Sequence, residues 1–312
     1  YLLFRSFCKL AMRAVPEGSS AESVPVKSRL LALDLLKSIL SQAGHRFRTV
    51  RQFVYGMRTY LGPALIGACL GNEYSVLDAA LSIAELLILR DSFRSCLKLE
   101  VRSLFERVLF RFAESPSAGV LRHRRTITFI ATIFEQPQIM VDFFVNYDCD
   151  LGSPNIFAKC IEELASSSNL DTPQPEHARS IRVLSLSALA NSLNALYKWY
   201  LNGNQYAHVD TRQQQPDESE SENVKDVLEA YETLSSASEF VKGFRSKKVL
   251  ETGISKFNLN PKKGIEYLLE NQFIPARTPN DVAYFLLNTA GLDATLIGEC
   301  LGEADEFRVS VM

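Results

Sequence analysis

The feature that most constrains this chain is the helical spacing of its apolar residues, which recur every three or four positions along nearly the whole sequence. β-Type alternation of useful length is not found, and dipeptides typical of strand turns are scarce. The sequence therefore predicts an all-α protein. The spacing is clearest between residues 92 and 114, where one stripe contains Phe93, Leu97, Val101, Leu104, Phe105, Val108 and Phe112.

Many such helices follow one another with short joins rich in Gly, Pro and Ser. Antiparallel helices with short connections favour an α-solenoid of armadillo or HEAT type. No motif repeats at a fixed period, so the solenoid prediction rests on the rhythm of the helices. Besides 92–114, helices are expected at residues 2–14, 27–42, 49–60, 75–89, 123–134, 138–145, 155–164 and 176–200.

The composition changes at Asn202, where a polar and acidic segment begins that contains few core-forming residues. Such a segment cannot bury enough apolar surface to offset the entropy of ordering it, which predicts a linker or a long surface loop. Three short helices are expected near the end, with caps at Asn260, Thr278 and Asp293. The predicted domains are therefore a solenoid at 1–201, an acidic linker with weak helix at 202–245, and a further helical part at 246–312.

The formal net charge of −2 hides an uneven distribution of charge. Residues 1–125 hold 19 Lys and Arg against 10 Asp and Glu, and the remainder holds 15 against 26. Within the basic part, Arg90, Arg94, Lys98 and Arg102 recur every four residues and would line one side of a helix. This stripe is either an ordinary solvated face or a surface for anionic lipid, where each basic residue contributes about 1 kcal/mol. Nucleic acid is a weaker alternative, because the second part is acidic and aromatic residues do not alternate with the basic ones.

No constellation of residues for catalysis, metal binding or cofactor binding is found in the sequence. The six cysteines and four histidines are scattered and form no paired spacing, which favours reduced thiols in a cytosolic protein over disulfides or a metal site. Phosphate loops, dinucleotide fingerprints and hydrolase motifs do not occur. No stretch approaches ~20 uninterrupted apolar residues, so no transmembrane helix is expected, and no secretory leader is recognised.

The most unusual segment is the pentapeptide formed by Asn146, Tyr147, Asp148, Cys149 and Asp150. It lies between two expected helices, and Asn and Asp suit a helix–helix turn because their side chains bond nearby backbone groups. A catalytic pair of carboxylates would need a cleft and a perturbed pKa. The residues therefore indicate a structural turn that could also take part in an interaction.

The segment V-N-Y-D-C-D-L-G-S-P-N-I-F resembles the signature box of the large BIG-type guanine-nucleotide exchange factors for ADP-ribosylation factors. In that family the box lies in the region of homology upstream of the Sec-seven domain. Other segments resemble the family in the right order: Leu2–Leu10 resembles the start of the upstream region, and Lys256–Leu268, Asp281–Ala283 and Leu292–Glu303 resemble the start of the Sec-seven domain.

The resemblance implies a regulatory solenoid followed by the first helices of an all-helical exchange domain. In the family, a glutamate in an F-R-L-P-G-E-A-type segment displaces Mg²⁺ from the GTPase, and this chain is expected to stop before that segment. Glu299 and Glu303 lie in an earlier helix and are not assigned this role. We therefore expect no catalytic residue, no metal and no cofactor, and we expect exchange activity only in the longer parent protein.

The resemblance also implies partners and a location. The parent acts on an ADP-ribosylation-factor GTPase, and the box is associated with contacts to the upstream dimerisation region, to recruiting GTPases and to Golgi or endosomal membranes, which the protein binds peripherally. Our hypothesis is that Asn146 and Asp148 hold the turn so that Tyr147 and its neighbours present a partner surface. The alternative is a helical-repeat adaptor without exchange activity, against which the motif order in residues 256–303 argues.

Overall fold

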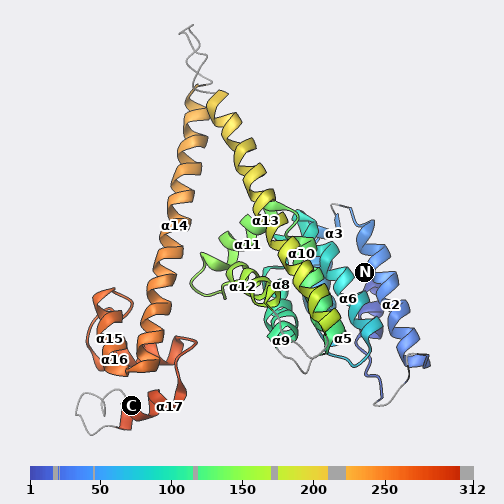
Figure 1. Cartoon of the computed structure of the whole chain (residues 1–312), viewed down its shortest axis with the longest axis horizontal. Coiled ribbons are helices and arrows are strands. Elements are labelled where there is room, and N and C mark those ends of the chain that lie inside the picture. The colour runs from blue at the N-terminus through green and yellow to red at the C-terminus, as the bar shows by residue number, and fades with distance from the viewer. Residues whose placement is uncertain are drawn as a thin grey trace. The chain divides into compact units, whose positions relative to one another are not determined.

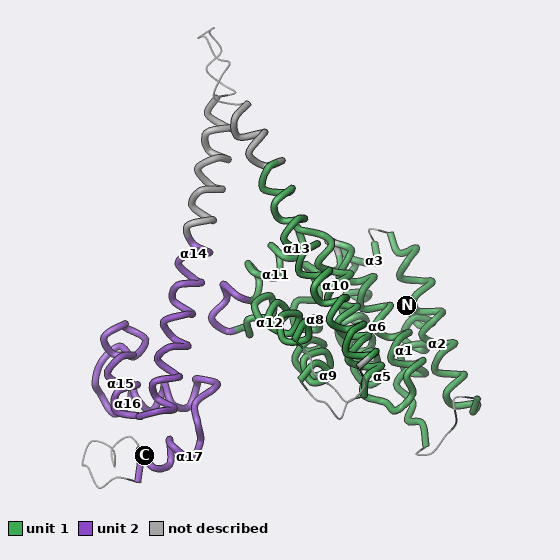
Figure 2. The backbone as a smooth tube through the Cα atoms, viewed as in Figure 1, with its two compact units in different colours: residues 1–147, 153–218 green, residues 148–152, 219–312 purple. Residues whose placement is uncertain are grey.

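The fold was analysed in a computed structural model that describes residues 1–16, 20, 22–44, 46–114, 119–169, 175–209 and 223–302. These residues contain helices and no strand, which confirms the all-α prediction. The chain divides into two compact units (Figure 2). Unit 1 comprises Tyr1–Tyr147 and Ser153–Glu218, and unit 2 comprises Asp148–Gly152 and Ser219–Met312.

The helices before residue 210 pack mainly on near neighbours in the sequence, as expected for a solenoid (Figure 1). Helix α1 packs on α2, α2 on α6, α5 and α10 also on α6, and α10 and α12 on α13. Among the described residues, three π-helical segments, named η1, η2 and η4, interrupt the α-helices. The bounds are α1 Leu2–Ala11, α2 Val24–Ser41, α3 Arg46–Thr49, α4 Arg51–Gly56, η1 Met57–Leu61, α5 Gly62–Cys69, α6 Tyr74–Leu89, α7 Asp91–Arg94, α8 Lys98–Leu104, η2 Phe105–Leu109, α9 Phe110–Glu114, α10 Val120–Ile133, α11 Pro137–Phe143, η4 Phe144–Asp148, α12 Ile156–Ser168 and α13 Pro175–Val209.

The core of unit 1 contains a cluster of fully buried aromatic rings. The ring of Phe105 meets the rings of Phe143 and Phe129 edge to face, with centroids 5.4 and 6.1 Å apart. Such geometry is favoured because the positive edge of one ring meets the negative face of the other. The cluster fixes η2, α10 and α11 against one another and so positions the elements around the candidate site.

The single helix predicted for residues 92–114 is divided into α7, α8, η2 and α9. The backbone of Leu97 leaves the helical region, with φ −121° and ψ 28°, which separates α7 from α8. Phe93 and Leu97 are nevertheless both buried, so the apolar pattern survives the break. A π-helical turn inserts an extra residue without changing the apolar character of its surroundings, and the sequence pattern therefore does not reveal it.

Unit 2 contains α14 Asn223–Leu259, α15 Pro261–Glu270, α16 Pro279–Asn288 and α17 Ala294–Gly302. The three predicted helix starts are confirmed. The side chain of Asn260 accepts a hydrogen bond from the Lys263 amide at 3.3 Å, and that of Thr278 accepts one from the Asp281 amide at 3.2 Å. At the start of α17, Oδ1 of Asp293 accepts a hydrogen bond from the Thr295 amide at 2.8 Å. A small core fills the unit and contains Phe257, Leu268, Ile274, Val282, Phe285 and Leu286.

The predicted acidic linker falls largely on the ends of two long helices. Helix α13 continues to Val209 and α14 begins at Asn223, whereas residues 210–222 lie outside the described part of the chain. The predicted domain boundaries at 201 and 245 therefore stay a prediction. No described helix is long and apolar enough to cross a membrane.

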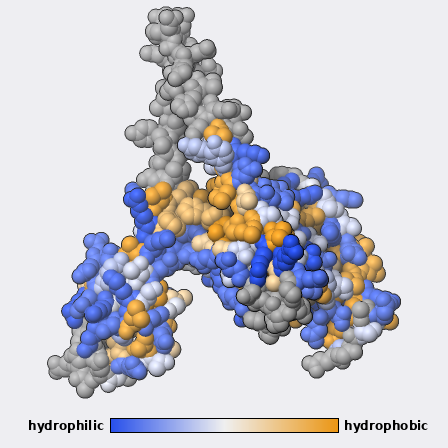
Figure 3. Space-filling model, in the orientation of Figure 1, coloured by the Kyte–Doolittle hydropathy of each residue, from blue (hydrophilic) through white to orange (hydrophobic). Residues whose placement is uncertain are grey.

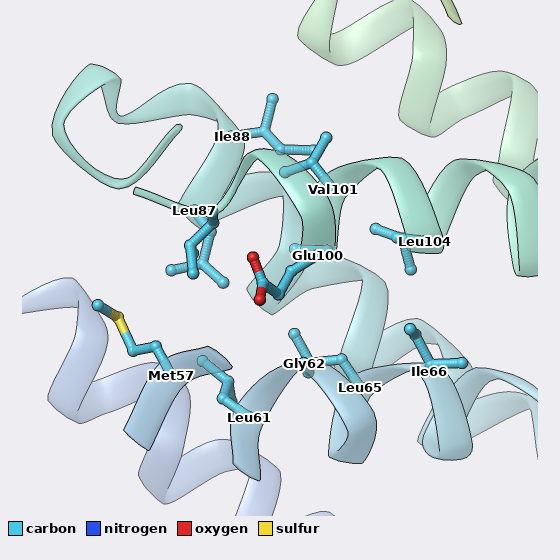
Figure 4. A pocket seen from close by; sticks show the side chains of 12 residues that line it. Met57, Leu61, Gly62, Leu65, Ile66, Leu87, Ile88, Glu100, Val101 and Leu104 are labelled. Atoms are coloured by element: carbon cyan, nitrogen blue, oxygen red, sulfur yellow. The ribbon is translucent and has the colours of Figure 1, made fainter. Parts of the chain in front are cut away.

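A small apolar cavity of about 30 Å³ lies among η1, α5, α6 and α8 (Figure 4). The side chain of Glu100 points into it between Met57, Leu61 and Leu87. A Cβ atom at Gly62 would lie 3.0 Å from Cγ of Glu100, so the glycine makes room for this side chain. A cavity of this size holds about one water molecule, and we regard it as a packing feature rather than a ligand site.

Candidate interaction site beside the signature pentapeptide

A polar cleft of about 330 Å³ in unit 1 is the strongest candidate site. It lies where α7 and α8 meet α11 and η4. Two sets of residues that the sequence singled out separately come together here: Arg94 and Lys98 from the basic series, and Asn146 and Tyr147 from the pentapeptide. The remaining lining residues are Ser95, Val101, Asp142 and Phe143.

Arg94 links the two walls of the cleft. Its Nη2 and Nε atoms donate to Oδ2 of Asp142 at 2.5 and 3.1 Å, and its Nη1 donates to the carbonyl of Ile88 at 2.6 Å. Only 8% of the Arg94 side chain is exposed. A guanidinium held by a carboxylate and a carbonyl is a structural connection between α7 and α11. It is therefore poorly placed to meet a lipid headgroup.

Tyr147 is buried, which differs from the expectation that it presents a partner surface. Its side chain is 4% exposed, its ring packs edge to face on Phe143 at 5.6 Å, and its hydroxyl donates to the carbonyl of Lys98 at 3.0 Å. Burial raises the pKa of the Tyr147 hydroxyl, so the phenol stays neutral and a donor. The Nζ of Lys98 lies 5.8 Å from the ring centroid. Tyr147 thus holds η4 against α8.

Asn146 is the exposed member of the pentapeptide in this cleft. Its Nδ2 donates to the carbonyl of Asp142 at 2.8 Å, one helical turn earlier. Asn146 and Ser95, on opposite walls, are the exposed residues among those that line the cleft. The prediction that Asn146 lies in an inter-helix turn is wrong, because Asn146, Tyr147 and Asp148 belong to η4.

The basic residues do not form the single helical stripe that their spacing predicts. Helix α7 ends at Arg94 and α8 begins at Lys98. Because the helix is interrupted between them, the four-residue spacing does not align the basic residues on one helix face. Arg90 donates to the carbonyls of Leu40 and Ser41 at 3.1 and 2.5 Å, and Arg102 pairs with Glu106 at 3.2 Å. The lipid-binding role of Arg90, Arg94, Lys98 and Arg102 stays a prediction.

The other three residues of the pentapeptide belong to unit 2. Asp148 and Cys149 are 1% and 7% exposed, and Oδ1 of Asp150 accepts a hydrogen bond from the Gly152 amide at 3.1 Å, as expected for an Asp in a turn. Cys149 lies close to α14 within this unit, because a Cβ atom at Gly243 would come 2.6 Å from its carbonyl oxygen.

Gly243 and Lys247 of α14 were not singled out from the sequence. Lys247 is 4% exposed, and burial lowers its pKa while the nearby carboxylates of Asp148, Glu251 and Asp150 act in the opposite direction. A glycine within a helical pattern can signal that another backbone approaches closely, so Gly243 was the sequence feature that could have indicated this contact. The acidic residues of the pentapeptide therefore serve as electrostatic partners of a buried lysine.

The arrangement suits recognition rather than bond-making chemistry. Burial raises the pKa of the thiols of Cys8 and Cys69 to about 12 and also raises that of Cys149, which keeps these thiols protonated. Among the described residues no group of three or more His, Cys, Asp or Glu is placed to hold a metal ion. The cleft instead offers polar groups on rigid helices.

Comparison with known families agrees with the two-part organisation. Residues 1–156 match the family described as Mon2/Sec7/BIG1-like, HUS domain, and residues 246–312 match the Sec7 domain. The chain therefore belongs to the BIG-type exchange factors that combine HUS and Sec7 domains, which confirms the resemblance seen in the sequence.

Individual relatives align along the whole chain. The chain is 31% identical over 345 positions to brefeldin A-inhibited guanine nucleotide-exchange protein 1 of Homo sapiens. It is also 31% identical over 339 positions to brefeldin A-inhibited guanine nucleotide-exchange protein 4 of Arabidopsis thaliana. These alignments cover 100% of the chain but only 18% and 19% of the relatives. The chain thus spans about a fifth of the length of the curated relatives it matches.

Proposed function

We propose that this chain is the regulatory region of a guanine-nucleotide exchange factor for ADP-ribosylation factors, followed by the start of its exchange domain. The parent protein would promote GDP-to-GTP exchange in Golgi or endosomal vesicle transport, as a cytoplasmic protein bound peripherally to these membranes. The observation that carries the proposal is the order of the HUS and Sec7 matches within one chain. A helical-repeat adaptor would not be expected to contain the second match.

We assign the cleft beside the pentapeptide an interaction role within this function. The Arg94–Asp142 ion pair and the buried Tyr147 fix its walls, while its lining residues Asn146 and Ser95 are exposed. A rigid polar cleft of this kind favours docking of another protein segment, because little entropy is lost when its walls are already ordered. The partners we propose are the upstream dimerisation region of the parent and its recruiting GTPases.

Exchange activity should be absent from the 312-residue chain. The sequence contains no F-R-L-P-G-E-like segment, so no glutamate is available to compete for the phosphate and Mg²⁺ of the GTPase. Release of a fluorescent GDP analogue from an ADP-ribosylation factor should proceed at the spontaneous rate when the chain is added. A parent protein with a complete Sec7 domain should accelerate it. Acceleration by the 312 residues alone would contradict the assignment of activity to the parent.

Binding to anionic membranes should depend on Lys98 and Arg102. Reversing both charges with Lys98→Glu and Arg102→Glu should reduce flotation with phosphatidylserine vesicles by tenfold or more, since each basic residue at such a surface contributes about 1 kcal/mol. Arg94 is left intact, because its burial would confuse folding with binding. The matched control reverses Lys9 and Lys37, which are exposed on α1 and α2. If the unmodified chain, the Lys98 and Arg102 variant and the control float equally, Lys98 and Arg102 are ordinary solvent-exposed residues without a role in membrane binding.

A further inference from the structure

A groove in unit 1 lies between α13 and the connection from α10 to α11, and it shares no lining residue with the cleft beside the pentapeptide. Its volume of about 420 Å³ lies within the range of ligand-binding sites. Glu135 of the connection and Pro137 of α11 form one wall. Helix α13 forms the other wall, with Asn191, Asn194, Ala195, Lys198 and Trp199. We call it the Trp199 groove.

The polar side chains of the Trp199 groove are exposed and unused within the described part of the chain. The side chains of Asn191 and Asn194 make no hydrogen bond there. Glu135 and Lys198 form no ion pair there, although both line the groove. In the cleft beside the pentapeptide, by contrast, the amide of Asn146 is already bonded within its own helix turn. The polar groups of the Trp199 groove are therefore available to a ligand.

Trp199 adds an aromatic surface to these polar groups. It is the single tryptophan of the sequence and is 46% exposed, although tryptophan is highly buried on average. Among the described residues its indole N–H finds no acceptor. Figure 3 shows apolar and polar residues next to one another along the upper part of α13. A large aromatic ring with an unused donor is a common anchor at protein interfaces.

The arrangement of polar groups favours an extended peptide as the occupant. Each Asn side chain offers a carbonyl acceptor and an NH₂ donor. These groups match the backbone N–H and C=O groups that an extended chain leaves unpaired. A helical partner bonds its own backbone and docks into an apolar groove instead. Asn191, Asn194, Ala195 and Lys198 follow one another on one face of α13, and the small side chain of Ala195 leaves room for a peptide backbone.

We propose that the Trp199 groove binds a short extended peptide of a partner protein, with a basic residue opposite Glu135, an acidic residue opposite Lys198 and an apolar residue against Trp199. The two walls carry opposite charges, so a peptide with complementary charges is favoured and one with the reverse order is repelled. A phosphate-containing ligand is disfavoured, because Lys198 is the single basic residue that lines the groove and the carboxylate of Glu135 faces the same space.

Selection from a phage library of random linear peptides on the full 312-residue chain tests the proposal. The enriched peptides should contain a basic, an apolar and an acidic residue, and they should lack the spacing of three and four residues that marks an amphipathic helix. Since the chain has one tryptophan, a change in its fluorescence emission during titration with a synthetic copy of an enriched peptide would report binding beside Trp199.

Trp199→Ala should weaken binding of the selected peptide about tenfold or more, as expected for an aromatic anchor. Tyr200→Ala is the matched control, because Tyr200 is the next residue of α13, is 60% exposed and does not line the groove. Its affinity should stay within about twofold of the unmodified chain. Fluorescence anisotropy of the labelled peptide measures both variants, and unchanged circular dichroism would show that both remain folded.

A charge exchange tests the position of the peptide in the groove. Glu135→Lys should weaken the selected peptide about tenfold or more, and replacing the basic residue of the peptide by glutamate should restore its affinity for this variant. The proposal would be overturned if no peptide were enriched over a parallel selection on the Trp199→Ala chain, or if Trp199→Ala and Tyr200→Ala bound equally well. Enrichment of amphipathic helical peptides alone would also overturn it, because the groove would then accept a helix.

Discussion

Gly264→Ala should disrupt the packing of unit 2. A Cβ atom at Gly264 would lie 2.3 Å from Cα of Phe257 and 2.5 Å from its backbone nitrogen, far inside van der Waals contact. The obstacle is the backbone of α14 rather than the end of a flexible side chain, so α15 must move away. Phe257 is fully buried, and moving α15 would expose it. We expect a loss of about 3 kcal/mol or more, at or beyond the upper end of ordinary overpacking.

Hydrogen exchange of the α15 and α16 amides measures this effect within unit 2, without assuming that the whole chain unfolds in one step. Gly298→Ala on α17 is the matched control, because nothing lies within 4 Å of its Cβ position and the residue is exposed. Alanine there should be neutral or stabilise by up to about 1 kcal/mol. If the two variants exchange at equal rates, the close approach of α14 and α15 would be refuted.

These two glycines show how far the sequence could predict the fold. The starts of α15 and α16 were predictable, because Asn260 and Thr278 bond the backbone three residues away and the signal is local. The role of Gly264 was not predictable, since it depends on a second helix that approaches from elsewhere in the chain. Gly298 and Gly264 have the same local appearance in the sequence, and only the tertiary packing distinguishes them.

The candidate site was predicted as two separate features that the structure places together in one cleft. The pentapeptide was recognised by its resemblance, and Arg94 and Lys98 by their spacing, but Asp142 was not noticed. An arginine repeated every four residues looks the same in a sequence whether it faces solvent or a half-buried carboxylate. The break after Arg94 and the π-helical turn at η4 rotate the side chains in ways that apolar periodicity does not record.

Arg94→Met should destabilise unit 1 by about 3 kcal/mol, because removing one partner of a largely buried ion pair leaves the other charge uncompensated. Asp142 would retain only the hydrogen bond that Nε2 of Gln138 donates to its Oδ1 at 2.8 Å, and the carbonyl of Ile88 would lose its donor. Methionine keeps a similar length and apolar character, so the change reports the loss of the charge and its hydrogen bonds. Urea unfolding followed by circular dichroism measures the difference.

A double-mutant cycle separates the ion pair from the rest of the site. Arg94→Met combined with Asp142→Asn should be less destabilised than the sum of the single variants, with a coupling free energy of about 1 to 3 kcal/mol. Arg107→Met on the exposed side of η2 is the control and should remain within about 0.5 kcal/mol of the parent. Additive effects would mean that Arg94 and Asp142 act independently. Coupling would instead show that the cleft holds its shape before any partner arrives, which is the property that the proposed docking role requires.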